Sequence, residues 1–142
     1  MAKIFVMCGI PASGKTTLAN QLSHKYESVV YSYDELRKNR LSKCMPTRPY
    51  FTNLIRQSLI NNQNVIVDDL YITKESRHKL LSDISDIACE KILIVLQTPL
   101  ETCIERDKTR TSHNLCRGVI CNFNKRYEQP TLDEGWDKIL YY

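Results

Sequence analysis

The residues best placed to do chemistry form a loop near the amino terminus, GIPASGKT, which runs from Gly9 to Thr16. The loop matches the pattern G-x-x-x-x-G-K-[ST], and it follows an apolar run and precedes a helical pattern, as this motif requires. Its glycines let backbone amides approach phosphate oxygens, and the amino end of the next helix directs further N–H groups at the anion. The loop therefore predicts a binding site for a nucleoside triphosphate.

Two side chains of this loop have expected tasks of their own. Lys15 is expected to bridge the β- and γ-phosphates, and Thr16 is expected to place its hydroxyl on Mg²⁺. The residues expected to bind the nucleotide are Gly9, Ala12, Ser13, Gly14, Lys15, Thr16 and Thr17. The alternative, a loop of purely structural use, is disfavoured because strand, loop and helix follow one another in the required order.

Two neighbouring carboxylates, Asp68 and Asp69, end the apolar run at residues 65–67. In an open α/β sheet the carboxyl ends of the strands line the ligand crevice, and a carboxylate there can hold the water shell of Mg²⁺. The sequence therefore predicts that one of the two serves the metal, and it leaves open which one. The alternative is an ordinary acidic residue at the start of a helix.

A third carboxylate, Asp34, follows the second apolar run at residues 28–32, and Arg37 comes three residues later. Asp34 is expected beside the phosphate loop, where a carboxylate can accept a proton from an attacking hydroxyl. Arg37 could hold a substrate phosphate by a forked contact. The alternative is a helix-capping Asp with an exposed ion pair to Arg37.

Two arginines, Arg106 and Arg110, are four residues apart and are expected on one face of a helix. Two guanidinium groups above the triphosphate could neutralise charge on the transferred γ-phosphoryl group. The polar stretch at residues 109–114 suits a mobile lid. The alternative is a solvated basic face.

The elements that must position these residues alternate along the chain. Apolar runs predict strands at residues 3–8, 28–32, 64–68, 91–96 and 136–142. Helical patterns cover residues 15–26, 33–41, 48–61, 73–88, 99–107 and 117–127, with Thr73 as an expected helix cap. This alternation predicts an α/β fold: a three-layer P-loop NTPase sandwich with a mostly parallel sheet of about five strands and an arginine-bearing lid.

Length and composition fit this fold and exclude other classes. With 142 residues the chain is expected to be a single domain over residues 1–142. A hydrophobic content of 42% and a charged content of 25% exclude a disordered chain. No apolar run is long enough to predict a membrane span, and residues 1–8 lack the features of a signal peptide.

Cysteine and histidine usage predicts neither a disulfide framework nor a metal cluster. The six cysteines match no zinc spacing, and Cys8, Cys89 and Cys103 lie in apolar contexts typical of buried thiols. A cytoplasmic, reducing compartment is therefore expected. The three histidines are scattered, so metal chemistry through His is not expected.

The net charge of +4 conceals two basic blocks. Residues 36–67 contain no acidic residue, and residues 106–126 contain only Asp107. The cations of the two blocks are Arg37, Lys38, Arg40, Lys43, Arg48 and Arg56, then Arg106, Lys108, Arg110, Arg117, Lys125 and Arg126. Basic side chains can follow a phosphate backbone, and Tyr50 and Phe51 could stack a terminal base. The alternative is a solvated face with two core aromatics.

Five segments of the chain, in sequence order, resemble P-loop kinases of the polynucleotide 5′-hydroxyl kinase type, including the phage enzyme and the kinase half of polynucleotide kinase-phosphatase. They are GIPASGKTT, SYDELR, VIVDDLYITKESR, RDKTR and KRYEQPTLDEGWDKIL. The segment with two carboxylates also resembles kinases of seryl-tRNA, and zeta-toxin-like sugar-nucleotide kinases share the fold and the loop.

The resemblance implies ATP and Mg²⁺ as cofactors at Lys15 and Thr16. It implies Asp34 as the general base, and it implies Arg37 and Arg77 as substrate-binding residues. Arg106 and Arg110 would be the catalytic groups of the lid. No phosphatase domain is expected, so any end healing would consist of the kinase step alone.

Three functions therefore remain open at this point. The first is an ATP-dependent kinase of the 5′-hydroxyl end of DNA or RNA, in the context of nucleic acid repair. The second is a kinase of a small molecule, a nucleotide-sugar or an aminoacyl-tRNA hydroxyl. The third is a non-catalytic nucleotide-binding switch, which needs Lys15 and Thr16 but has no need for Asp34 with Arg37. The sequence predicts no membrane partner and leaves the oligomeric state open.

Overall fold

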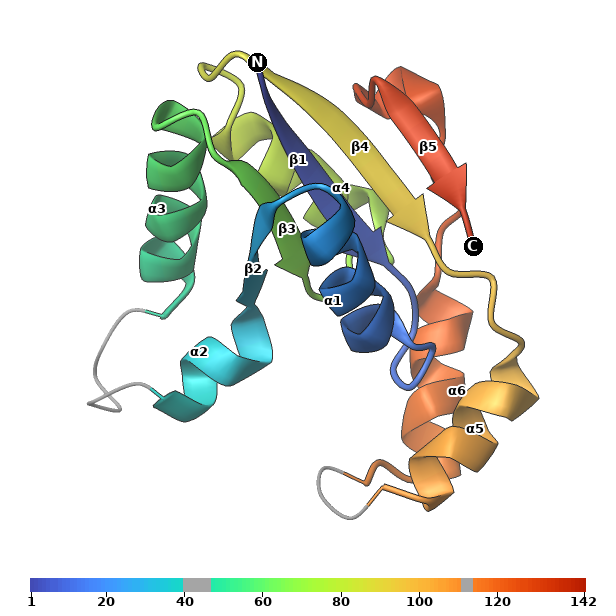
Figure 1. Ribbon diagram of the computed structural model, residues 1–142. Helices are drawn as coiled ribbons and strands as arrows, with labels where there is room; N and C mark the ends of the chain where they lie inside the picture. The colour runs from blue at the N-terminus through green and yellow to red at the C-terminus, as the bar shows by residue number, and fades with distance from the viewer. Residues whose placement is uncertain (40–46, 111–113) are drawn as a thin grey trace.

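A single parallel sheet forms the centre of the computed structural model, which describes residues 1–39, 47–110 and 114–142 (Figure 1). The sheet has five strands in the order β2-β3-β1-β4-β5, and all four pairings are parallel. The strands are β1 (Ala2–Cys8), β2 (Ser28–Ser32), β3 (Asn64–Asp68), β4 (Cys89–Val95) and β5 (Lys138–Tyr141). The expected parallel α/β architecture is confirmed.

Six α-helices and one short 3-10 helix are found in the described residues. They are α1 (Lys15–Lys25), α2 (Tyr33–Asn39), α3 (Thr47–Ile60), α4 (Lys74–Asp83), α5 (Leu100–Lys108), α6 (Arg117–Arg126) and η1 (Leu132–Glu134). None of these helices has the length and hydropathy that a membrane span needs. The predicted cap is confirmed, because the Thr73 hydroxyl accepts the backbone N–H of Ser76 at 3.2 Å.

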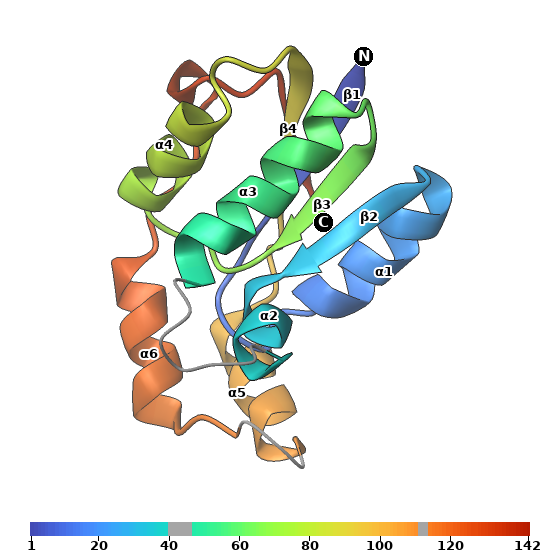
Figure 2. The same cartoon turned by 90° about the vertical axis from the view of Figure 1, so that its left-hand side faces the viewer.

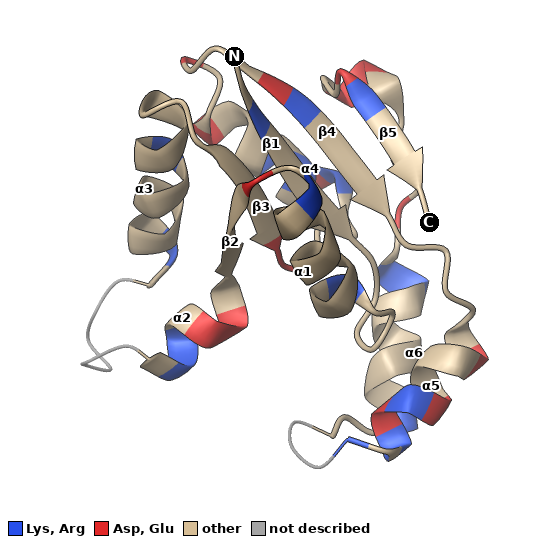
Figure 3. Cartoon of the chain, viewed as in Figure 1, with Lys and Arg blue, Asp and Glu red and all other residues tan. Residues whose placement is uncertain are grey.

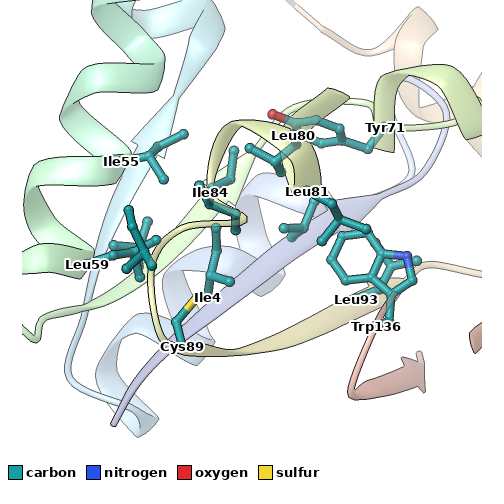
Figure 4. Packing of buried hydrophobic residues seen from close by; sticks show 14 of the residues in the cluster. Ile4, Ile55, Leu59, Tyr71, Leu80, Leu81, Ile84, Cys89, Leu93 and Trp136 are labelled. Carbon is teal, nitrogen blue, oxygen red and sulfur yellow. The ribbon is translucent and has the colours of Figure 1, made fainter. Parts of the chain in front are cut away.

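The helices cover both faces of the sheet, so that the fold has three layers (Figure 2). Alternate side chains of β1 point to opposite faces, as in any strand. Phe5 and Met7 pack against α1, whereas Ile4 and Val6 belong to the larger cluster shared with α3 and α4. Figure 4 shows this cluster, in which Ile55 and Leu59 of α3 lie at one end and Trp136 lies near Leu81 and Leu93 at the other.

The strand register brings the expected site residues to one edge of the sheet. Ser32 at the end of β2 lies opposite Asp68 at the end of β3, and Val67 lies opposite Val6 of β1. Because the strands are parallel, all their carboxyl ends meet at this edge, where open α/β sheets bind ligands. The helices α5 and α6 lie beyond the same edge (Figure 1).

Most elements end within one or two residues of their predicted bounds, but one helix is several residues shorter than predicted. The helix predicted at residues 73–88 ends at Asp83, and residues 84–87 form turns and a bend that bury Ile84 and Ile87 in the core. The apolar spacing of these isoleucines continued the helical pattern, but the chain must turn after Asp83 to begin β4 on the sheet. Residues 40 and 41, predicted as the end of the second helix, lie outside the described residues.

Arg77 is a structural residue, which corrects the expectation that it binds substrate. Its side chain is 0% exposed and pairs with Glu134. It donates from Nε to Glu134 Oε1 at 2.8 Å, and its other nitrogens donate to the backbone oxygens of Tyr71 and Glu128. These bonds fasten α4 to the segment that leads into β5. Burial alone would raise the pKa of Glu134, but hydrogen bonds from Arg77 and Trp136 outweigh it and hold that pKa below its ordinary value.

We predict that Arg77→Met lowers the free energy of unfolding by about 3–5 kcal/mol, because it leaves a largely buried carboxylate without its partner. Urea denaturation followed by circular dichroism measures the change. The matched control is Arg117→Met, which removes the exposed ion pair to Glu101 and should change stability far less. Equal effects of the two substitutions would contradict the structural role of Arg77.

Candidate active site

The loop between β1 and α1 adopts the backbone shape expected for holding phosphate. Gly14 has φ +96° and Ala12 has φ +64°, which places both residues in the left-handed region. The loop is tied to its neighbours at two points: Thr98 donates its hydroxyl to the backbone oxygen of Ser13 at 2.7 Å, and the Gly9 N–H donates to the backbone oxygen of Leu70 at 3.0 Å. The segments that follow β3 and β4 thus fix the loop in place.

Lys15 lies inside this loop. Its ammonium group donates to the backbone oxygen of Ile10 at 2.9 Å, and the side chain is buried. Burial lowers the pKa of Lys15, and the negative charges of Asp68 and Asp69 oppose that shift. A cation held by the Ile10 carbonyl and near the Ser13 hydroxyl, at the amino end of α1, is placed to meet phosphate oxygens.

Thr16 and Asp68 meet across the sheet edge. The Thr16 hydroxyl donates to Asp68 Oδ2 at 2.8 Å, and Asp68 is only 7% exposed. Burial raises the pKa of Asp68, while the hydrogen bond from Thr16 and the charge of Lys15 oppose the rise. This contact joins the phosphate loop to the end of β3.

Thr16 and Asp68 are suited to hold Mg²⁺ together with the phosphates of a bound nucleotide. Both side chains present hard oxygen atoms, which Mg²⁺ prefers, and the ion commonly keeps several waters while taking few protein ligands. In the described ranges no group of three or more His, Cys, Asp or Glu side chains forms a metal cage. A bound magnesium ion would therefore depend on nucleotide phosphates as well as on this pair.

Asp69 directly follows Asp68 in the chain, but its carboxylate contacts other groups. Its Oδ2 forms an ion pair with Arg48 at 3.0 Å, and its Oδ1 accepts the backbone N–H of Leu70 at 2.9 Å. Both oxygens are thus engaged away from Thr16. The sequence left the metal carboxylate open between the two residues, and the geometry favours Asp68.

Asp34 occupies the first turn of α2, directly beyond the end of β2. It is exposed, and within the described residues it has no hydrogen-bond or ion-pair partner. Arg37 is also exposed on this helix, with its guanidinium carbon 5.7 Å from the centre of the Tyr33 ring. The ion pair between Asp34 and Arg37, which was the alternative to a functional role, is not formed, so both groups are open to a ligand.

The two arginines of α5 and its carboxyl end face the phosphate loop. Arg106 Nη1 would lie 3.2 Å from a Cβ atom added at Gly14, so its guanidinium group sits against the loop. Arg106 and Arg110 line a cavity of about 440 Å³ together with loop and α1 residues. α5 is anchored there because Cys103 and Ile104 pack in one cluster with loop residues. Part of the expected lid, residues 111–113, lies outside the described residues.

The basic blocks are only partly available as a binding surface. Arg56 forms a two-pronged ion pair with Asp86, and Arg117 forms one with Glu101. Phe51 is 2% exposed and belongs to the core, which corrects its expected stacking role, whereas Tyr50 is 44% exposed. Amphipathic helix packing placed one of these adjacent aromatics inside and the other outside.

Sequence reasoning missed the role of Arg48, which it counted only as one charge of a basic block. No local signal links Arg48 to Asp69, because the chain between them contains nearly all of α3 and the whole of β3. Arg48 and Asp69 also border a second cavity of about 740 Å³, which lies among α3, α4 and α6. The buried state of Cys8, Cys89 and Cys103, by contrast, was predicted and is confirmed.

The fold and the site together define a kinase-like P-loop protein. A phosphate loop between β1 and α1, an acid at the end of β3 and arginines after β4 are arranged on a parallel sheet of the expected kind. The chain belongs to the family described as chromatin associated protein KTI12, whose model matches residues 1–141.

Several curated proteins are related to the chain over nearly its whole length. Protein KTI12 of Saccharomyces cerevisiae is 26% identical, and the match covers 97% of this chain and 50% of that protein. L-seryl-tRNA(Sec) kinase of Methanococcus maripaludis is 24% identical, with 94% and 56% covered. The bifunctional polynucleotide phosphatase/kinase of Schizosaccharomyces pombe is 25% identical, with 96% and 32% covered. The chain spans about half the length or less of these relatives.

Solved structures show the same fold. Kti12 of Chaetomium thermophilum in complex with ADP-AlF3 has a TM-score of 0.73 at 19% identity, with 98% of this chain and 88% of that chain covered. A fungal RNA kinase has a TM-score of 0.73 at 18% identity, with 99% and 38% covered. The resemblance of the sequence to P-loop kinases of the polynucleotide kinase type is thereby confirmed.

We predict that Asp68→Asn weakens ATP binding in the presence of Mg²⁺ by roughly 10- to 100-fold, as loss of a metal-supporting carboxylate typically does. Binding in the presence of EDTA should not change. Isothermal titration calorimetry under both conditions measures the difference. The control is Asp69→Asn, which should leave the Mg²⁺-dependent affinity as it is.

Asp68→Asn also has an expected effect on stability. Because burial raises the pKa of Asp68, its ionised form disfavours folding at neutral pH, and this cost disappears as pH falls through the raised pKa. Asn carries no charge, so Asp68→Asn should unfold no more easily than the wild type at neutral pH. A large loss of stability would mean that the carboxylate is structural.

Proposed function

We propose that this chain is an ATP- and Mg²⁺-dependent phosphotransferase that moves the γ-phosphate to a hydroxyl. The observation that carries the proposal is the joint placement of three groups at one sheet edge. Lys15 lies within the loop, Thr16 and Asp68 meet at 2.8 Å, and the exposed Asp34 follows the adjacent strand. A non-catalytic switch would need the first two features but not the third.

The roles of the residues follow from in-line displacement. Asp34 accepts the proton of the attacking hydroxyl, which lies between this carboxylate and the γ-phosphorus. Lys15, Arg106 and Arg110 stabilise negative charge on the transferred group and on the departing ADP. Thr16 and Asp68 would hold Mg²⁺, which would neutralise phosphate charge when bound. The loop amides orient the triphosphate.

The acceptor hydroxyl that we propose belongs to a nucleic acid, most simply a 5′-hydroxyl end of DNA or RNA. Figure 3 shows Lys and Arg on α2, α5 and α6, around the edge at which the strands end. Arg37, Lys38, Arg106 and Arg110 are exposed there, and exposed cations can bind phosphates. The names of one relative, a polynucleotide phosphatase/kinase, and of one structural neighbour, an RNA kinase, support the same class of acceptor.

ATP hydrolysis is a second candidate function. Asp34 is exposed on α2, so water can reach the position that a substrate hydroxyl would occupy. A protein that used water as the acceptor would release free phosphate in place of a phosphorylated product. Cys8, Cys89 and Cys103 are free and buried, which supports the proposed cytoplasmic, reducing compartment. This compartment is compatible with either activity.

We predict that Asp34→Ala lowers phosphoryl transfer by roughly 10²- to 10⁴-fold, the usual contribution of a general base, while leaving ATP binding nearly unchanged. Lys15→Ala should weaken both transfer and binding. The assay follows labelled γ-phosphate from ATP to a short 5′-hydroxyl oligonucleotide, with and without Mg²⁺ and at two salt concentrations.

Three outcomes of this assay distinguish the candidate functions. Labelled oligonucleotide that requires Asp34 and Mg²⁺ supports the kinase, and DNA is then compared with RNA. Release of free phosphate with unlabelled oligonucleotide supports hydrolysis instead. Bound but intact ATP with each acceptor would contradict both activities and leave a binding module. Normal transfer by Asp34→Ala would remove this residue from the mechanism.

A further inference from the structure

The helix that carries Asp34 is held to the molecule by few contacts. None of the seven residues of α2 is buried. Two of them, Tyr33 and Leu36, are partly buried and pack against the large hydrophobic cluster. The position of Asp34 therefore depends on how firmly its neighbour Tyr33 is fixed.

Tyr33 is fixed by two side chains of α3. Its ring meets the ring of Phe51 edge-on, with the centroids 5.3 Å apart and the planes at 72°. The guanidinium carbon of Arg48 lies 3.6 Å from the centre of the same ring, which is close stacking of a cation on an aromatic face. Arg48 and Phe51 thus hold Tyr33 from two sides.

Arg48 is itself held by Asp69. Its Nη2 lies 3.0 Å from Asp69 Oδ2, and the other oxygen of Asp69 accepts the backbone N–H of Leu70. Asp69 directly follows β3, whose last residue is Asp68. A continuous chain of contacts therefore runs from the end of β3 through Asp69, Arg48 and Tyr33 to Asp34.

We propose that Arg48, held by Asp69, is a positioning residue that fixes Tyr33 and thereby sets the place of Asp34. The inference rests on the proposed phosphotransferase function for its catalytic consequence. The two neighbouring carboxylates then have separate tasks: Asp68 faces the phosphate loop and Asp69 secures the general base. One strand end would thus set the spacing between the triphosphate and the acceptor hydroxyl.

An arginine at position 48 can make both contacts at once, with the Tyr33 ring and with the Asp69 carboxylate. A guanidinium group is planar, so it can stack on Tyr33 and still donate in its plane to a carboxylate. The ammonium group of a lysine would keep the charge but lose the flat contact. Arg48→Lys therefore tests the stacking, whereas Asp69→Asn tests the ion pair.

The experiment compares Arg48→Ala, Arg48→Lys and Asp69→Asn with a control on the same helix, Arg56→Ala. Arg56 forms an ion pair with Asp86, at 2.6 Å and 2.9 Å, that does not involve Tyr33. Two readouts are measured for each variant: kcat and KM in the phosphoryl-transfer assay, and hydrogen–deuterium exchange of the segment Tyr33–Asn39 in the whole chain.

The expected result is a loss of turnover without a loss of nucleotide binding. Arg48→Ala should lower kcat by roughly 10²-fold, the cost of a small misplacement of a reacting group, with little change in KM for ATP. Exchange in the segment Tyr33–Asn39 should become faster. Arg48→Lys and Asp69→Asn should be intermediate, and combining Asp69→Asn with Arg48→Ala should add little, because the residues act as one unit.

Either of two results would overturn the inference. The first is unchanged exchange of the segment Tyr33–Asn39 in both Arg48 variants. The second is an equal loss of turnover in Arg56→Ala. If the wild type transfers no phosphate, the proposed function fails, but the exchange measurement still decides whether Arg48 fixes α2. If Arg48→Ala does not fold, Arg48→Lys and Asp69→Asn give the same two readouts.

Discussion

The hydrogen bond from Thr16 to Asp68 is the contact on which the candidate site depends. It joins two residues that are 52 positions apart, and it exists because β1 and β3 are paired in parallel. The phosphate loop follows one strand and the acid ends the other, so the pairing register sets their distance. A shift of the register by one residue would turn the side chains of β3 to the opposite face. The hydrophobic cores on both sides of the sheet therefore maintain the site geometry.

Burial divides the charged groups of the site into two kinds. Lys15 and Asp68 are buried close to each other, where each partly compensates the cost of placing the other away from water. Asp34, Arg37, Arg106 and Arg110 are exposed around them. In the proposed function the buried pair would meet the nucleotide, and the exposed groups would meet the acceptor. This division fits a reaction in which one substrate binds deep in the loop and the other arrives from solvent.

The anchoring of the surrounding elements is also unequal. α5 buries Cys103 and Ile104 against the loop, and α4 is fastened by the buried ion pair of Arg77 and Glu134. α2 buries no residue and relies on Tyr33, which Arg48 and Phe51 hold. Elements with few buried contacts open at low free energy, so α2 is the part of the site whose position needs an additional polar tie.

The sequence by itself determined the strands, the loop and the fold class, because apolar runs and the phosphate-loop spacing are local patterns that survive in almost any context. It also located the cap at Thr73 and the buried thiols. Only the tertiary structure showed that Asp68 contacts Thr16 whereas Asp69 pairs with Arg48. It also showed that Arg77 and Phe51 are buried. Each of these outcomes depends on which distant segment faces a given side chain. Adjacent residues of similar chemistry, such as two aspartates or two aromatics, look alike until packing assigns them different partners.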